Sequence, residues 1–133
     1  MAEAQVWLVE NRVGVIQAVS EAAKECGAKL LVWERGVEAI RALSASDYVR
    51  PALILMAEVP PDMSMVETVR SLGEHDTAQG IPIIGISDDM NCNMRDVSKV
   101  IGVAGWMCSP VTADKLGITL ECIETESLVA RPV

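Results

Sequence analysis

The sequence contains few aromatic residues. Its 133 residues include no Phe, one Tyr and three Trp, although half of the residues are apolar. The hydrophobic core must therefore be built mainly from Val, Ile, Leu, Met and Ala. The length suits one domain with a single core.

Basic residues are scarce as well. The chain has 11 Lys and Arg against 19 Asp and Glu, which gives a formal net charge of −8. Nucleic acid is excluded as a direct partner, because neutralising phosphates requires a basic face, whereas a protein partner is not excluded. No apolar run approaches the ~20 residues of a membrane span, and no signal segment precedes the first expected strand. We expect a cytoplasmic protein.

The cysteines and the single histidine suggest no metal site. Cys26, Cys92, Cys108 and Cys122 form no C-x-x-C pair, and His75 lies on a polar loop. Zinc sites usually combine such pairs with nearby histidines. We predict reduced thiols in a cytosolic protein, with Cys108 buried and unreactive, and no bound metal or cofactor.

Short apolar strands alternate with helices along the chain. Strands are expected over 5–10, 29–34, 52–56, 81–87 and 103–109. Apolar residues at three- and four-residue steps predict helices over 13–26, 37–43, 65–72, 94–101 and 112–126. This alternation predicts a five-stranded parallel sheet covered on both faces, and right-handed crossovers favour the flavodoxin-like order 2-1-3-4-5. We expect one domain over 1–126, followed by a tail or the start of a linker over 127–133.

Particular residues stand at the ends of the expected strands. The first strand ends in "VWLVEN", with Glu10 and Asn11 as its last residues. The third strand leads to Ala57, and Pro61 and Met63 follow four and six residues later. The carboxyl ends of parallel strands share one edge of the sheet, where ligands bind in such folds. These residues are therefore expected near one another.

The last two strands end in further motifs. The fourth strand reaches Ser87 in "PIIGISDD", and the fifth, in "GWMCSPVTADKL", carries Trp106, Ser109 and Pro110. With these motifs in this order, the chain from residue 5 to about 126 resembles the CheY-like receiver domains of bacterial two-component response regulators. The resemblance implies the flavodoxin-like fold and a role in phosphorelay signalling.

The resemblance also implies a role for each strand-end position. Receivers have two acids where Glu10 and Asn11 stand, the phospho-accepting Asp where Ala57 stands, and a Lys where Ser109 stands. Acyl-phosphate chemistry needs a nucleophilic oxygen, several oxygen ligands for Mg²⁺ and a cation for the phosphoryl group. Ala57 has no oxygen, and Ser109 has no charge. We therefore predict a non-enzymatic pseudo-receiver whose former pocket consists of these four residues and Ser87. Metal binding is not expected, and Glu10, with Asp62, would be its only weak remaining site.

Other interpretations stay open. Glu58 could act as a built-in mimic of a phosphorylated Asp, although strand alternation points it away from the pocket that Ala57 faces. Regulation through an atypical site such as Ser87 or Ser109 is a second alternative. A flavodoxin-like ligand-binding or enzymatic domain is a third, but "ENRVGVIQ" offers only Gly14 and no hydroxyl for a phosphate-binding loop.

The resemblance further implies where a protein partner binds. Receivers meet partners through their fourth helix, fifth strand and fifth helix, which here gives Arg95, Trp106, Leu116 and Leu120. We predict a packed Trp106 whose indole N–H reaches the surface. Leu116, Leu120 and Ile123 would extend an apolar stripe beyond the sheet, which allows a homodimer through the last helix. The partner itself, whether a signalling protein or an output domain, is not identified by the sequence.

Overall fold

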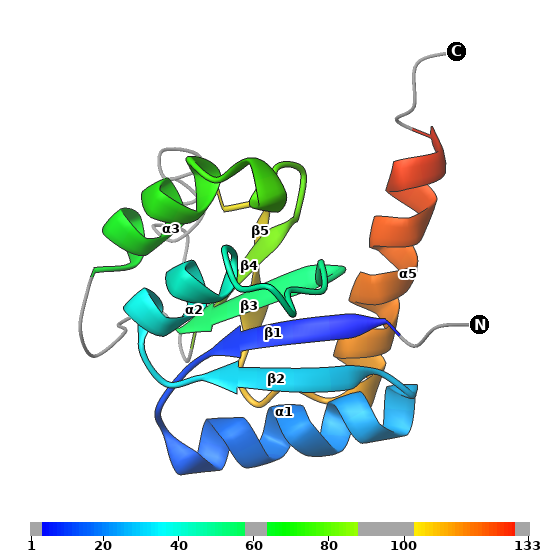
Figure 1. Ribbon diagram of the computed structural model, residues 1–133. Helices are drawn as coiled ribbons and strands as arrows, with labels where there is room; N and C mark the ends of the chain where they lie inside the picture. Colours follow the sequence, from blue (N-terminus) through cyan, green and yellow to red (C-terminus); the bar gives the residue numbers. More distant parts are fainter. Residues whose placement is uncertain (1–3, 58–63, 88–102, 130–133) are drawn as a thin grey trace.

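The computed structural model describes residues 4–57, 64–87 and 103–129 (Figure 1). One parallel sheet has the strand order β2-β1-β3-β4-β5. Its strands are β1 (Gln5–Val9), β2 (Lys29–Trp33), β3 (Leu53–Ala57), β4 (Ile83–Ser87) and β5 (Gly105–Cys108). The described helices are α1 (Val13–Cys26), α2 (Gly36–Ala42), α3 (Met65–Gly73), the short 3₁₀ helix η1 (Asp76–Ala78) and α5 (Ala113–Val129). The predicted flavodoxin-like fold is confirmed.

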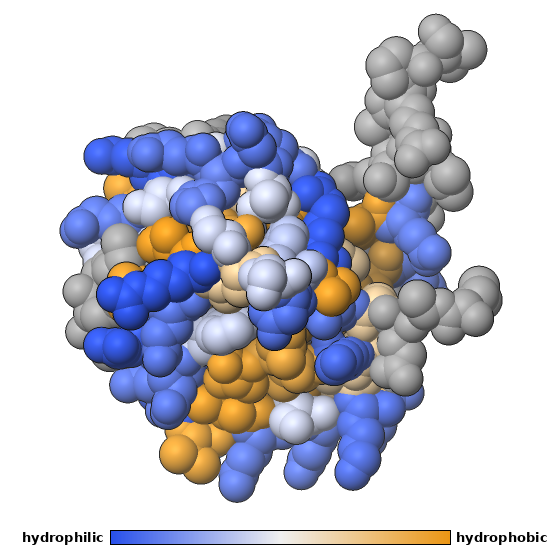
Figure 2. All heavy atoms as spheres, in the orientation of Figure 1, coloured by the Kyte–Doolittle hydropathy of each residue, from blue (hydrophilic) through white to orange (hydrophobic). Residues whose placement is uncertain are grey.

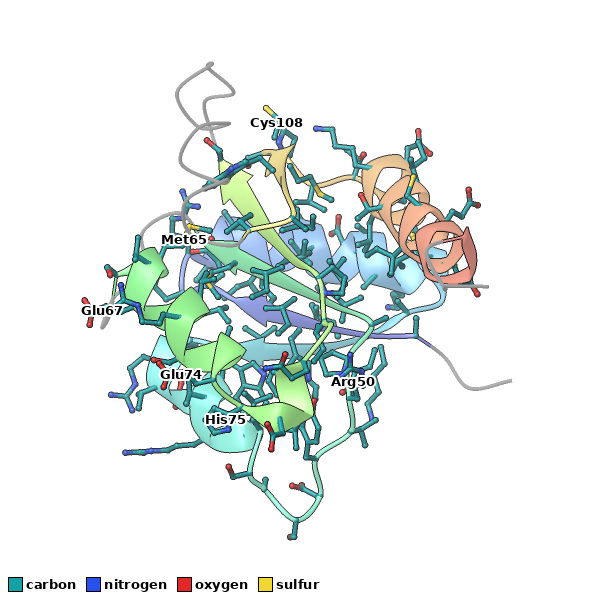
Figure 3. The ribbon with its side chains drawn as sticks, turned by 90° about the horizontal axis from the view of Figure 1, so that it is seen from above. Arg50, Met65, Glu67, Glu74, His75 and Cys108 are labelled. Atoms are coloured by element: carbon teal, nitrogen blue, oxygen red, sulfur yellow. The ribbon has the colours of Figure 1, made fainter. Side chains whose placement is uncertain are left out.

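Helices cover both faces of the sheet. Figure 3, seen from above, places α2 and α3 on one side of the strands and α1 and α5 on the other. Trp7 and Met56 belong to the core on the α2–α3 side, and Leu8 and Leu55 belong to the core on the α1–α5 side. Because successive side chains of a strand point to opposite faces, β1 and β3 supply both cores and are buried on both sides. This double burial fixes the positions of their carboxyl ends.

Three helix ends have the residues that their geometry requires. Gly27, which follows α1, has a φ of 72°, the left-handed conformation that glycine adopts without a steric cost. The Ser64 hydroxyl accepts the backbone N–H of Glu67 at 3.1 Å and caps the start of α3. The Thr112 hydroxyl accepts the N–H of Lys115 at 3.3 Å, which confirms the expected start of the last helix.

Some expected boundaries move. β3 includes Ala57, one residue beyond the expected end, so the strand itself reaches this position. α5 continues through Val129, so the first three residues of the expected tail are helical. The helix expected over 94–101 lies outside the described residues. Within the described part, no helix has both the length and the apolar character that a membrane crossing needs.

Candidate functional site

The carboxyl ends of β1 and β3 lie side by side. Val9 pairs with Met56 in the parallel register, so Glu10 follows β1 at the level of Ala57. Ala57 is the last residue of β3, and the described chain resumes only at α3. Asn11, the other expected pocket residue from this strand, is exposed. The backbone thus places the expected acid and the expected acceptor position at one edge of the sheet.

The ends of β4 and β5 reach the same edge. Ser87 is buried and pairs with Cys108, and the N–H of Ser109 donates to the Ser87 carbonyl at 2.8 Å. The Ser109–Pro110 peptide bond is cis. Lys115 Nζ donates to the carbonyls of Cys108 at 2.9 Å and of Pro110 at 3.0 Å. A cation is therefore present beside Ser109, but it is used to hold the turn between β5 and α5.

Glu10 is buried, and its carboxylate is fully occupied. Only 1% of the residue is exposed. Its Oε2 accepts the backbone N–H groups of Asn11 and Arg12 and the Nε–H of Arg12, each at 3.1 Å. Its Oε1 accepts Arg12 Nη2 at 3.0 Å. Two oxygens thus accept four hydrogen bonds, two of them from one guanidinium in the bidentate manner typical of arginine.

Magnesium does not fit this arrangement. Mg²⁺ requires near-octahedral oxygen ligands and is usually held by one or two carboxylates. The Glu10 oxygens are already committed to Arg12 and to backbone N–H groups, Asn11 offers only an amide, and the side chain of Ala57 has no ligand atom. In the described ranges, no three His, Cys, Asp or Glu residues come together as metal ligands. Glu10, Asn11 and Ala57 by themselves therefore do not form a magnesium site.

Trp106 differs from its expected environment. The residue is half-buried and packs against the α2–α3 core. Its indole Nε1 is buried and has no hydrogen-bond partner among the described residues. The expectation that this N–H reaches the surface is wrong, because the ring is held inward against β4 rather than turned toward solvent.

The expected apolar stripe on α5 faces the core. Leu116 has no exposed surface, and Leu120 and Ile123 are half-buried against the α1–α5 core. These three side chains pack against the core, so they do not form an outward stripe. Among the side chains of this helix that the structure describes, from 113 to 124, the large apolar one left exposed is Ile118, at 61%. Arg95, the remaining residue of the expected partner surface, lies outside the described residues.

The thiols are free where the structure describes them. Cys26 is half-buried and donates to the Ala113 carbonyl at 3.3 Å, and Cys122 is exposed. Cys108 is half-buried rather than buried, and its sulfur points away from the sheet (Figure 3). It differs from expectation because it ends an edge strand, where one side of the residue has no neighbouring strand. Cys92 lies outside the described residues.

Sequence reasoning missed Arg12, the residue that determines the state of this edge. The signal for it was a basic residue two positions after the strand-end acid, close enough to fold back on that acid. The residues that follow β3 and carry part of the predicted resemblance, Glu58, Pro61 and Met63, lie outside the described residues, as does Asp62. Whether Glu58 approaches the edge therefore stays a prediction.

Similarity to known proteins is found at the level of structure. No family model and no curated protein matches the sequence. The chemotaxis response regulator CheY4 of Vibrio cholerae superposes with a TM-score of 0.78 at 23% identity, covering 92% of this chain and 99% of that one. The fold is that of a receiver domain. The predicted resemblance is confirmed to this extent.

Two other receiver structures agree. The receiver domain of a sensor histidine kinase from Pseudomonas aeruginosa, which holds a magnesium ion in its active-site cleft, gives a TM-score of 0.79 at 19% identity over 92% of this chain and 99% of that one. The receiver domain of a modulated diguanylate cyclase from Desulfovibrio desulfuricans G20 gives 0.76 at 25% identity over 96% of this chain and 98% of that one. The receiver fold therefore accounts for nearly the whole chain.

Proposed function

We propose that this chain is a pseudo-receiver: a signalling module of the two-component type that binds another protein without being phosphorylated itself. The receiver domains among its structural neighbours support a module of this class. On this proposal the domain is not an enzyme and acts in the cytoplasm, where such signalling partners occur.

The observation that carries the proposal is the pairing of Glu10 with Arg12. A receiver that binds Mg²⁺ needs its strand-end acid to be free for the ion. Here a guanidinium two residues along the chain already neutralises that acid, at 3.0 and 3.1 Å. Expelling Arg12 would strip a buried carboxylate of half its hydrogen bonds before any metal ligand is gained. The edge is thus stabilised in a metal-free arrangement.

Two neighbouring positions support the same conclusion. Ala57, at the end of β3, offers no oxygen to attack a phosphoryl group. Ser109 offers no positive charge to stabilise one, and Lys115 beside it is engaged by two carbonyls. The nucleophile, the second acid and the cation are all replaced at their usual positions, by Ala57, Asn11 and Ser109, which makes loss of the chemistry a better explanation than its transfer to another residue.

The proposal is tested by phosphorylation with a small donor. The protein is incubated with acetyl phosphate and Mg²⁺ beside a receiver domain known to accept phosphate, and intact masses are recorded. We expect the control to gain one phosphoryl group and this chain to gain none. A phosphoryl group mapped to the strand-end edge, including Ser87 or Ser109, would contradict the proposal.

A second arm separates the loss of the acceptor from the loss of the other groups. Ala57→Asp restores only the nucleophile, and Ala57→Asn is its control of matching shape without the carboxylate. We expect neither variant to be labelled efficiently, because Arg12 still occupies Glu10 and Ser109 is still neutral. Efficient labelling of Ala57→Asp alone would show that the metal and cation sites function after all.

The partner surface is expected around β5 and α5. Ile118 is a large apolar side chain left exposed there, close to Trp106 and Lys115 around a shallow hollow of about 330 Å³. Binding can be screened against histidine kinases, phosphotransfer proteins and response regulators of the same organism. We expect Ile118→Asp to weaken such a complex and Val13→Asp, at an equally exposed site on α1, to leave it unchanged. The reverse pattern would move the interface to α1.

A further inference from the structure

A further cleft lies away from the strand-end edge. It is a cleft of about 550 Å³ between the β1–β2 side of the sheet, helix α2 and the segment that follows α2. Small-molecule sites usually have volumes of ~300–1,000 Å³, so this cleft is of the right size for one. Figure 2 shows apolar side chains gathered over β2 and its surroundings, bordered by polar ones. Its position on the sheet face separates it from the former phosphorylation pocket.

The floor of the cleft is aromatic. Trp7 and Trp33 meet edge to face with ring centroids 5.3 Å apart, and Trp7 and Tyr48 meet in the same way at 5.8 Å. Leu31 completes the floor. The whole chain has only four aromatic residues, and three of them line this one cleft. A flat, aromatic ligand would match these ring surfaces best, because aromatic rings favour edge-to-face and offset contacts.

The cleft is not filled by its own side chains. Helix α2 and the segment after it present the small side chains of Ala42 and Ala45, beside which Trp33 and Tyr48 stay half-buried, whereas only 1% of Trp7 is exposed. Trp7 donates its indole N–H to Gln5 at 3.2 Å, whereas the indole Nε1 of Trp33 is buried without a partner in the described part of the chain. Buried donors are usually paired, so in the free protein the Trp33 N–H lacks the hydrogen bond that such a group normally makes.

The rim carries two unpaired basic side chains. Lys29 and Arg41 are both exposed, and neither side chain has a hydrogen bond or ion pair to another described residue. Of the two rim acids, Glu38 accepts the N–H of Arg35 and lies 4.0 Å from its guanidinium, which leaves Asp47 as the uncommitted acid. The rim thus holds two cations and two acids, and its cations, Lys29 and Arg41, stay unpaired within a chain whose net charge is −8.

We propose that this cleft binds a small planar aromatic carboxylate. The ring would lie on Leu31, Trp33 and Tyr48, and the carboxylate would lie between Lys29 and Arg41 at the rim. The aromatic side chains of the cleft select the flat apolar body, and the unpaired Lys29 and Arg41 select the anion. The site is independent of the strand-end edge, so binding here would give the domain a ligand signal that needs no phosphorylation.

The test uses 2-naphthoate as the probe and 2-naphthalenemethanol as its neutral counterpart. Binding is followed by calorimetry and by quenching of tryptophan fluorescence, since two of the three Trp line the cleft. We expect 1:1 binding of 2-naphthoate with a Kd below about 1 mM at low salt, and binding of the alcohol at least about fivefold weaker. Absence of saturable binding by the folded protein, or equal binding of the two compounds, overturns the proposal.

Two pairs of variants locate the site. Lys29→Gln/Arg41→Gln should weaken 2-naphthoate about fivefold or more and remove its advantage over the alcohol, whereas Lys24→Gln/Arg70→Gln makes the same charge change elsewhere and should have no such effect. Ala45→Trp should fill the cleft and abolish binding, whereas Ser46→Trp, outside the lining, should not. Unchanged binding in Lys29→Gln/Arg41→Gln or in Ala45→Trp would overturn the assignment. Dimerisation that Ala45→Trp abolishes would instead assign the cleft to a second copy of the chain.

Discussion

The indole ring of Trp106 lies against Gly85 of the neighbouring strand. The two residues are register partners in β5 and β4, and a Cβ built on Gly85 would come within 2.4 Å of Cζ3 and 2.5 Å of Cε3 of Trp106. No Cβ atom can approach a ring carbon so closely. The missing side chain at Gly85 is therefore what gives the indole its place on this face of the sheet.

Replacing Gly85 by Ala should displace this ring. Met65 Cε, 2.9 Å from the same built Cβ, is the end of a flexible side chain and can move, but the rigid indole must leave as a whole. We expect Gly85→Ala to lower the free energy of unfolding by about 1–3 kcal/mol and to shift the tryptophan emission of the folded protein. Urea unfolding monitored by fluorescence measures both effects.

Gly73→Ala is the control for this substitution. Gly73 is the last residue of α3, and no atom lies within 4 Å of the position that its Cβ would occupy. The change should leave stability equal or slightly higher, since alanine favours helix more than glycine does. Equal stability and equal emission of Gly85→Ala and the parent protein would show that the ring does not depend on Gly85.

The pair of Glu10 and Arg12 should contribute measurably to stability. Arg12→Gln removes the guanidinium and leaves a buried carboxylate with two backbone N–H donors. We expect a loss of about 1–3 kcal/mol, below the ~3–5 kcal/mol of a fully buried pair because the Arg12 side chain is 46% exposed. Chemical unfolding measures the loss, and Glu10→Gln/Arg12→Gln should regain part of it because no unpaired charge remains.

The exposed pair of Arg35 and Glu38 is the matched control for this loss. Its charged atoms are 4.0 Å apart, and about half of each side chain is exposed. Arg35→Gln should cost roughly 0–0.5 kcal/mol, as is usual for surface ion pairs. If Arg12→Gln costs no more than Arg35→Gln, then Arg12 does not stabilise the strand-end edge, and the main support for the pseudo-receiver proposal is lost.

Truncation should destabilise the protein strongly at Leu116 and hardly at all at Ile118. Leu116 has no exposed surface, so Leu116→Ala should lower the unfolding free energy by about 2–5 kcal/mol through the cavity that it leaves. Ile118 is mostly exposed, so Ile118→Ala should change stability by less than about 0.5 kcal/mol. Thermal or urea unfolding of the two variants distinguishes them. Similar losses would show that α5 does not bury Leu116 in preference to Ile118, and a larger loss for Ile118→Ala would show that the two faces are reversed.

The strand order and the layers could be predicted from the sequence because they depend on patterns that the backbone obeys. Apolar runs such as 53–56 and helical steps such as those from Val13 to Cys26 are enough to predict a doubly covered parallel sheet. Strand ends then converge on one edge whatever the side chains are. The convergence of Glu10 and Ala57 follows from the parallel register alone.

The environments of individual side chains could not be predicted in the same way. Whether Leu116 faces outward depends on the angle at which α5 crosses the sheet, which a helical period does not contain. The pairing of Arg12 with Glu10 depends on how the chain turns between β1 and α1. The inward position of Trp106 depends on a glycine in another strand, and one sequence does not reveal which residues become neighbours across strands.

Tyr48 should make stability depend on pH in the alkaline range. Its hydroxyl donates to the Thr77 carbonyl at 2.7 Å, and the same carbonyl accepts Arg50 Nη1 at 3.2 Å. Burial raises the pKa of Tyr48 above its usual 10.0, although the Arg50 guanidinium acts in the opposite direction. With the pKa higher in the folded state, the unfolded chain releases this proton first as the pH rises. The stabilisation from Tyr48 is therefore complete below pH 10.0 and is lost as the pH rises through the folded-state pKa.

Tyr48→Phe isolates this contribution, because it removes the titrating hydroxyl and keeps the ring that packs on Trp7. Near neutral pH the variant should be less stable by about 0.5–1.5 kcal/mol, the usual value of one hydrogen bond. Above pH 10.0 the parent protein should lose stability faster than the variant, so the difference between them should shrink. Urea unfolding of both proteins at several pH values measures that difference, in which the titration of lysines common to both cancels. A constant difference across the alkaline range would show that the Tyr48 hydroxyl titrates alike in the folded and unfolded chains, and that its hydrogen bond to Thr77 does not favour the protonated form.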